Sequence, residues 1–221
     1  MKSKNTLAII AILFLAINYV SAQDQMTFGV RAGVNFQNIN GKDMLGDKLE
    51  NDLLTGFHAG VNVEIPVGTD IYFQPGLLFS TKGSKLDEGE NATAKLHTSN
   101  LELPLNLLFK PLLGTGHMLL GFGPYIGYGI GGKVDTEIAG ISDEIDIEFQ
   151  NEVSTSDPVD VFYMRPFDAG ANFIIGYEMS NMLSFQLNAQ LGLLDIYPKT
   201  VGDDDTTWKN TGFGLSVGYR F

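Results

Sequence analysis

Histidine, serine and acidic side chains are the groups of this sequence that could carry out chemistry. A hydrolytic or acyl-transfer site needs a serine nucleophile, a histidine base and an acid that converge. The three histidines, His58, His97 and His117, fall on separate segments of the chain, which argues against a metal site shared between them. The serines that leave a hydrolytic site open are Ser80, Ser84 and Ser99. Nothing in their spacing compels that hypothesis, so we expect no catalytic residue, no metal site and no cofactor.

Two other motifs invite a chemical interpretation. The run Asp203, Asp204 and Asp205 offers the oxygen ligands that divalent cations prefer, but it lacks the alternating spacing of a dedicated calcium loop, which favours a solvated acidic tip. The Gly-rich run Gly121–Gly132 superficially resembles a phosphate-binding loop. No helical pattern follows it and alternation continues through it, so we interpret it as a strand whose glycines leave space.

The elements that would position these groups follow a targeting segment. Residues 1–22 contain two lysines, an apolar run of about a dozen residues and a small-residue cleavage site at Val20-Ser21-Ala22, as in a secretory signal peptide. The run is shorter than the roughly 20 residues of a membrane helix. We expect a cleaved signal followed by one domain over residues 23–221. The absence of cysteine excludes a disulfide framework, a thiolate site and an acylated lipoprotein N-terminus.

The rest of the chain alternates with period two. Every second residue is apolar in eight segments of about ten residues, which predicts β-strands. They span residues 27–37, 56–65, 71–82, 100–110, 118–130, 167–178, 183–193 and 212–221. The links between them alternate strictly between long and short, at residues 38–54, 66–70, 83–99, 111–117, 131–166, 179–182 and 194–211. Outer-membrane barrels have short periplasmic turns and long outer loops.

The composition of the two strand faces separates two kinds of barrel. A soluble lipocalin-like barrel would turn its apolar face inward, around a ligand. Here the polar face is mostly Gly, Asn, Gln and Ser, which suits a narrow lumen, and aromatic residues lie near the strand ends as in an interfacial girdle. We predict an all-β fold: an eight-stranded antiparallel up-and-down transmembrane β-barrel in the cell outer membrane. A soluble sandwich would not explain the rhythm of the loops.

Charge is distributed unevenly. The chain has 14 basic and 26 acidic residues and a net charge of −12, which argues against a nucleic-acid partner. Nineteen of the acids lie in the long links or at their margins. Charged residues on the inward face need partners, and we predict a structural lumen network of Arg31 and Arg220 with Glu64, Glu102 or Asp168. Lys82, Lys110 and Glu178 face the same lumen.

The link 131–166 is the most unusual one. It holds nine acids, and it also alternates locally, with Ile145, Ile147 and Phe149 against Asp146 and Glu148. We interpret it as an outer β-extension with a partly apolar edge, which could dock another chain. The alternative is an acidic loop that only repels anions.

Several motifs carry a family resemblance that spans essentially the whole mature chain. They are Gly29-Val30-Arg31-Ala32-Gly33-Val34-Asn35, the run from Phe73 to Gly83, Leu101-Glu102-Leu103-Pro104-Leu105, Gly121-Phe122-Gly123-Pro124-Tyr125, Phe167-Asp168-Ala169-Gly170 and Val217-Gly218-Tyr219-Arg220-Phe221. On these residues the chain resembles the PorT-like family of small outer-membrane β-barrels of the Bacteroidetes. The family commonly has an acidic residue where this chain has Gly76. The resemblance implies fold and location, and the founding member's role in protein secretion does not carry over.

Three functions remain open. An eight-stranded barrel is only wide enough for side chains, so the preferred hypothesis is a non-enzymatic protein with a structural or interaction role through its acidic outer loops. A narrow conduit or small-solute binder is the second, and a lipid-modifying enzyme is the third. As partners we expect outer-membrane lipid and, through the link 131–166, another protein; we expect the chain itself to be a monomer.

Overall fold

The computed structural model describes residues 26–87, 92–138, 140–158, 160–200 and 205–221, and the regular elements in these ranges are eleven strands. They are β1 (Thr27–Lys42), β2 (Asn51–Gly68), β3 (Ile71–Asp87), β4 (Ala92–Phe109), β5 (Leu112–Leu113), β6 (Gly116–Ile138), β7 (Ile141–Phe149), β8 (Phe162–Met164), β9 (Phe167–Glu178), β10 (Leu183–Gly192) and β11 (Thr207–Arg220). The predicted signal peptide lies outside the described residues, as do Asp203 and Asp204. No helix in these ranges is long and apolar enough to cross a membrane.

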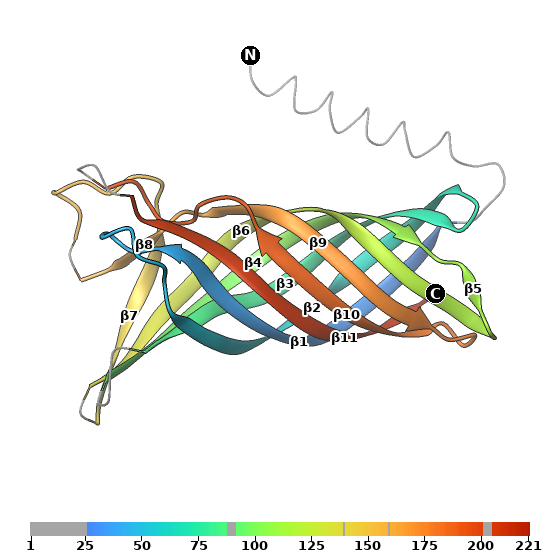
Figure 1. The fold of residues 1–221 in the computed structure, drawn as a ribbon, viewed down its shortest axis with the longest axis horizontal. Helices are drawn as coiled ribbons and strands as arrows, with labels where there is room; N and C mark the ends of the chain where they lie inside the picture. Colours follow the sequence, from blue (N-terminus) through green and yellow to red (C-terminus); the bar gives the residue numbers. More distant parts are fainter. Residues whose placement is uncertain (1–25, 88–91, 139, 159, 201–204) are drawn as a thin grey trace, which may run out of the picture.

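Strand pairing closes into a ring (Figure 1). Each of β1, β2 and β3 pairs antiparallel with the next strand, β4 pairs with β6, and β9, β10 and β11 follow β6 around the ring. The first and last strands complete it, in a register that runs from Gly29↔Arg220 to Lys42↔Thr207. The remaining strands, β5, β7 and β8, are additions at the ends of the barrel. The predicted antiparallel barrel is confirmed, and each predicted segment overlaps one strand of the ring.

The two faces of the ring settle which side is apolar. Phe122, Phe173 and Phe185 on the outer face are exposed by 59%, 52% and 52%, whereas the inward Lys82 and Asn106 are exposed by 2% and 1%. This is the arrangement of a barrel surrounded by lipid, with a polar interior. The lipocalin-like alternative required the opposite arrangement and is wrong.

The ring strands continue beyond the segments that the alternation marked. β4 has 18 residues and β6 has 23, against the roughly 9–11 residues with which a tilted strand crosses a membrane. The additional residues lie at the ends next to the long links, where the barrel extends past the apolar band. The links were therefore predicted too long, since both β4 and β6 occupy parts of them.

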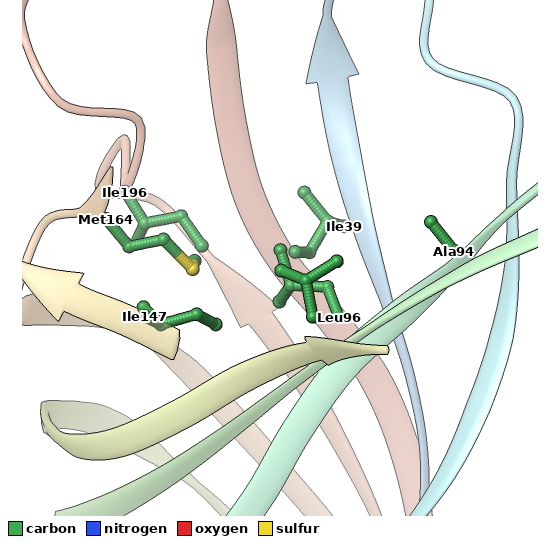
Figure 2. Close-up of a cluster of buried hydrophobic side chains, with 7 residues drawn as sticks. Ile39, Ala94, Leu96, Ile147, Met164 and Ile196 are labelled. Atoms are coloured by element: carbon green, nitrogen blue, oxygen red, sulfur yellow. The ribbon is translucent and has the colours of Figure 1, made fainter. Parts of the chain in front are cut away.

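A second hydrophobic region lies inside this extension. Figure 2 shows its buried side chains pointing toward one another. We call this cluster the outer plug: Ile39, Ala94, Leu96, Val134, Ile147, Met164 and Ile196. Its members come from β1, β4, β6, β7, β8 and the segment before β11, so the plug joins the ring to the long link 131–166. The partly buried Leu49, Leu86, Ile145, Phe149, Phe162 and Trp208 pack against it.

Candidate functional site: the charged lumen beneath the outer plug

A compact set of ion pairs lies in the lumen near the short turns. It consists of Glu64, Lys110, Glu178 and Arg220, and we call it the turn-side ion group. The Lys110 ammonium is 2.8 Å from Glu64 and 2.8 Å from Glu178, and the Arg220 guanidinium is 2.5 Å from Glu64 and 3.4 Å from Glu178. Every member is at most 7% exposed. Two cations alternate with two anions, so the group is neutral as a whole.

The strand ends explain why these four meet. Lys110 directly follows β4, Glu178 ends β9 and Arg220 ends β11, so all three lie at the rim formed by the short turns. Glu64 approaches the end of β2, and the inward Gln74 donates a hydrogen bond of 3.1 Å to it. Arg220 also donates to Asn62 at 3.0 Å. Amides therefore supply additional hydrogen bonds to Glu64 and Arg220, which buried ions need besides their ion pairs.

A second set lies closer to the long loops, and we call Lys82, Glu102 and Asp168 the loop-side ion group. The Lys82 ammonium is 3.0 Å from Glu102 and 2.9 Å from Asp168. Asp168 also accepts hydrogen bonds from the Tyr125 hydroxyl at 3.1 Å and from the Asn210 amide at 2.9 Å. One cation faces two acids here, which leaves the group one negative charge in excess.

Arg31 supplies the missing positive charge without direct contact. It is 9% exposed, and among the described residues it forms no ion pair within 4.0 Å. Its electrostatic partner is Glu102, across the lumen. With Arg31 included, the described part of the lumen holds four cations and four acids, so its interior is close to neutral.

A chain of hydrogen bonds crosses the lumen through His58. The ring nitrogens lie 2.5 Å from Asn35 Oδ1 and 2.7 Å from Ser216 Oγ. Because Asn35 Oδ1 can only accept, Nδ1 donates to it, and Nε2 shares a hydrogen bond with the Ser216 hydroxyl. Asn188 donates to that hydroxyl at 2.6 Å, and Asn35 donates to Ser80 at 3.1 Å. His58 is therefore a link between strands, hydrogen-bonded on both nitrogens.

The structure places the five predicted lumen residues in the lumen but divides them. Arg220 and Glu64 are directly paired, whereas Glu102 and Asp168 are joined through Lys82. Arg31 and Arg220 lie on paired strands, with Gly29 opposite Arg220, yet they belong to different parts of the lumen.

Sequence reasoning missed that lysines connect the acids. Lys82 and Lys110 each contact two carboxylates, while the prediction centred the network on the arginines. It also missed Tyr125, which is 1% exposed. All of these residues were already on the inward face, so the missing information was the register between distant strands. One signal could have identified Tyr125, namely a long inward side chain paired with a glycine on the neighbouring strand. The ring of Tyr125 lies over Gly170, where an added Cβ would come within 2.8 Å of it.

The structure turns the expected docking residues inward. Ile147 is 7% exposed and belongs to the outer plug, and Ile145 and Phe149 pack against it. Gly129 makes this possible, because a Cβ there would approach the Phe149 ring to 2.3 Å. The predicted β-extension exists as β6 and β7, but its apolar face is covered by the chain itself. Accordingly, Ile147 is buried by the chain itself, and Ile145 and Phe149 are partly covered.

The remaining candidates do not converge. His97 lies 3.5 Å from Asp135, His117 is in β6 beside the short turns, and His58 is in the lumen. Ser80 belongs to the hydrogen-bond chain and Ser84 is fully buried. Within the described ranges no serine is hydrogen-bonded to His97 and no group of three or more potential metal ligands occurs.

The outer surface of the β6–β7 hairpin is polar and acidic. Lys133 contacts Glu144 at 2.5 Å and Asp135 at 3.2 Å. Hydrogen bonds to these two carboxylates, Glu144 first, raise the pKa of the Lys133 ammonium above its usual range. Glu137 and Asp143 are also exposed and make no ion pair among the described residues, so the hairpin keeps an excess of negative charge.

Comparison with known proteins agrees with this geometry. The model of a family described as "Outer membrane protein beta-barrel domain" matches residues 21–197. Among curated proteins there is no match.

Several solved structures are similar at low identity. A major outer membrane protein of Thermus thermophilus is 15% identical, with 90% of this chain and 100% of that chain covered and a TM-score of 0.47. Ail, the attachment invasion locus protein of Yersinia pestis, is 11% identical, with 90% and 100% covered and a TM-score of 0.39. Neisserial surface protein A is 12% identical, with 89% and 98% covered and a TM-score of 0.40. Likenesses at this level carry no argument about this chain's activity.

Proposed function

The chain belongs to the outer membrane protein beta-barrel domain family and resides in the outer membrane, and from this premise we propose that it is a non-enzymatic barrel that acts through its acidic outer surface. The observation that carries the proposal is the contrast between an occupied lumen and an exposed acidic hairpin. The barrel serves as a membrane-embedded support, and the parts of β6 and β7 beyond the membrane present the interacting surface.

The first support is the filling of the lumen. Two ion groups and the His58 chain cross it, and the outer plug lies between them and the loop-side mouth. Buried ion pairs of this kind contribute little net stability but are strongly destabilising when one partner is removed. An interior held in this way suits a structural role better than transport.

The second support is the engagement of the reactive groups. His58 has both nitrogens hydrogen-bonded, Ser80 accepts from Asn35, and the acids of the loop-side ion group are paired. A catalytic site needs a base and a nucleophile free to reach a substrate. These contacts favour the non-enzymatic hypothesis over the lipid-modifying enzyme.

The interacting surface is the β6–β7 hairpin, which carries exposed acids on an extracellular extension. Asp143 and Glu144 lie on β7 opposite Thr136 and Asp135 on β6. Charge complementarity makes a protein with a basic surface the expected partner, with association that weakens as salt rises. This role replaces the apolar docking edge that the sequence suggested.

Two measurements on the purified, folded protein test the proposal. In planar bilayers we expect no conductance above the lipid background; steps of reproducible size would favour the narrow conduit. For the surface, we expect a lysine-rich peptide to bind at low salt, and Asp143→Asn with Glu144→Gln to weaken that binding about tenfold. Equal binding by this variant would reject the hairpin as the interacting surface.

The lipid-modifying enzyme has its own test. Its candidate group is His97, near Asp135. Incubation of the barrel with phospholipid and lipopolysaccharide should give no acyl transfer. A transfer activity that His97→Ala abolishes would overturn the non-enzymatic proposal.

Within the broader family we also propose PorT-like membership. The residues that support it are Gly29–Asn35, Leu101–Leu105 and Val217–Phe221, which occupy β1, β4 and β11 and its end. A PorT-like profile that aligns these motifs with the corresponding strands in other members would support the assignment. Better alignment with another subfamily would reject it.

A further inference from the structure

A small cavity lies in the middle of the lumen, beside Arg31. Its volume is about 40 Å³, and its walls include Arg31, His58, Glu102, Gln37, Asn188 and Gln190. These side chains come from strands on all sides of the ring. Leu78, Ile174 and Phe213 complete the wall, so the cavity is bounded by both polar and apolar residues.

Four buried polar atoms on residues of this wall have no hydrogen-bond partner among the described residues. They are Arg31 Nε, Gln37 Oε1, Asn188 Oδ1 and Glu102 Oε1. Glu102 Oε1 lies 3.0 Å from the Lys82 ammonium, whereas the other three have no ion pair either in the described part of the chain. Buried polar groups are almost always hydrogen-bonded, because leaving one unpaired is costly. One donor and three acceptors without a hydrogen bond at a single cavity indicate a ligand that both donates and accepts.

From this arrangement we propose that the cavity is a water-binding site in which ordered water joins the Arg31 guanidinium to the Glu102 carboxylate. A water molecule needs roughly 10–15 Å³ of such space, so the cavity accommodates about three. Water can accept from Arg31 Nε and donate to the amide oxygens of Gln37 and Asn188. It also bridges two opposite charges that do not touch.

The charges on the wall argue against a bound anion. Arg31 would attract one, but the Glu102 carboxylate lines the same cavity and the two free amide oxygens present further negative ends. A bound cation would meet the Arg31 guanidinium. A neutral, dipolar molecule is the ligand that satisfies all of these groups.

The direct test is a high-resolution crystal structure of the full folded barrel, with a second crystal soaked in sodium bromide. We expect water density within hydrogen-bond distance of Arg31 Nε and of the Gln37 and Asn188 oxygens, and no anomalous bromide peak. A bromide peak beside Arg31 would make the site an anion site. Density showing Arg31 in direct contact with Glu102, with no water between, would also overturn the proposal.

A pair of variants adds a matched control. Gln37→Leu removes one free acceptor and should lose the water bound to it, while the water at Arg31 stays. Asn106→Leu removes another buried lumen amide with an unpaired Oδ1 that does not line the cavity, and it should leave every water of the site in place. Loss of the same waters in both variants would contradict the assignment, and failure of either to fold leaves the wild-type crystals as the decisive experiment.

Discussion

The membrane-spanning and outer parts of the same strands have opposite polarity. In the membrane-spanning part of β4, Leu101 and Leu103 face outward with 42% exposure each, and Glu102 faces inward. In its outer part, Leu96 faces inward with 1% exposure while Lys95 is exposed. β6 repeats the change, from an outward Ile126 to an inward Val134. Above the apolar band the barrel is therefore built like a soluble protein.

This reversal shows that solvent decides which face is polar. Lipid accepts apolar side chains on the outer face, so the lumen takes the polar ones and must pair them. Beyond the membrane, water solvates a polar outer face, so the interior of that part of the barrel can form an apolar plug. The pairing of β4 with β6 changes register between Ser99 and Asn100, near the boundary between the membrane-spanning and outer parts. The turn-side ion group and the outer plug can therefore be disrupted separately.

The largest effect should come from Glu64→Leu in the turn-side ion group. This change leaves the buried Lys110 and Arg220 with Glu178 as their one carboxylate, and removing one partner of a buried pair costs about 3–5 kcal/mol. Urea unfolding followed by the mobility shift between folded and boiled protein should show the loss. The double variant Glu64→Leu with Lys110→Met restores neutrality and should recover most of it. A single variant as stable as the wild type would remove the ion group's structural role.

Leu96→Ala should damage the other region and spare the first. Truncating a buried leucine costs about 2–5 kcal/mol, but here the loss should stay in the outer plug. We expect faster proteolysis within residues 141–164, with unchanged mobility of the unboiled barrel. Ile141→Ala is the control, because that side chain is 76% exposed. Unfolding of the whole barrel by Leu96→Ala would show that the regions are not independent.

Arg220→Leu should have a smaller effect than Glu64→Leu. Glu64 keeps its contact with Lys110 at 2.8 Å and its hydrogen bond from Gln74, and Glu178 keeps its own contact with Lys110, so neither carboxylate is left without a donor. Losing hydrogen bonds to a charged group costs about 1.5–3 kcal/mol. The same urea titration measures it, and unchanged resistance to urea would contradict a structural role for Arg220.

Lys133→Met on the hairpin surface should have the smallest effect. Its ion pairs with Asp135 and Glu144 are exposed to solvent, and such pairs contribute little. The raised pKa of Lys133 means that any contribution is present below the ordinary lysine pKa and is lost as pH rises through the folded value. Unfolding midpoints at pH 7 should agree with the wild type within error. A clear loss of stability would show that these surface ion pairs of the hairpin contribute to the stability of the folded barrel.

Sequence alone could predict the membrane-spanning part and not the outer plug. Period-two alternation identified segments such as residues 100–110 because apolar and polar faces differ there. Above the boundary the faces exchange, and inward Leu96 and Val134 no longer continue the expected pattern, so their segments were assigned to the links. Parity places the charges on the inward face, but which of them pair depends on register around the ring, as Lys82 with Asp168 demonstrates.

The seam between β1 and β11 has a consequence for how the barrel can form. Gly29 pairs with Arg220 and the Phe221 amide donates to the Phe28 carbonyl at 2.8 Å, so the closing contacts join nearly the two ends of the described chain. Contacts of such long sequence separation form late and slowly. Until β11 pairs with β1, the edge of β1 is open and the ion pair between Arg220 and Glu64 has not formed. Closure of the seam and completion of the turn-side ion group should therefore occur as one late event in assembly.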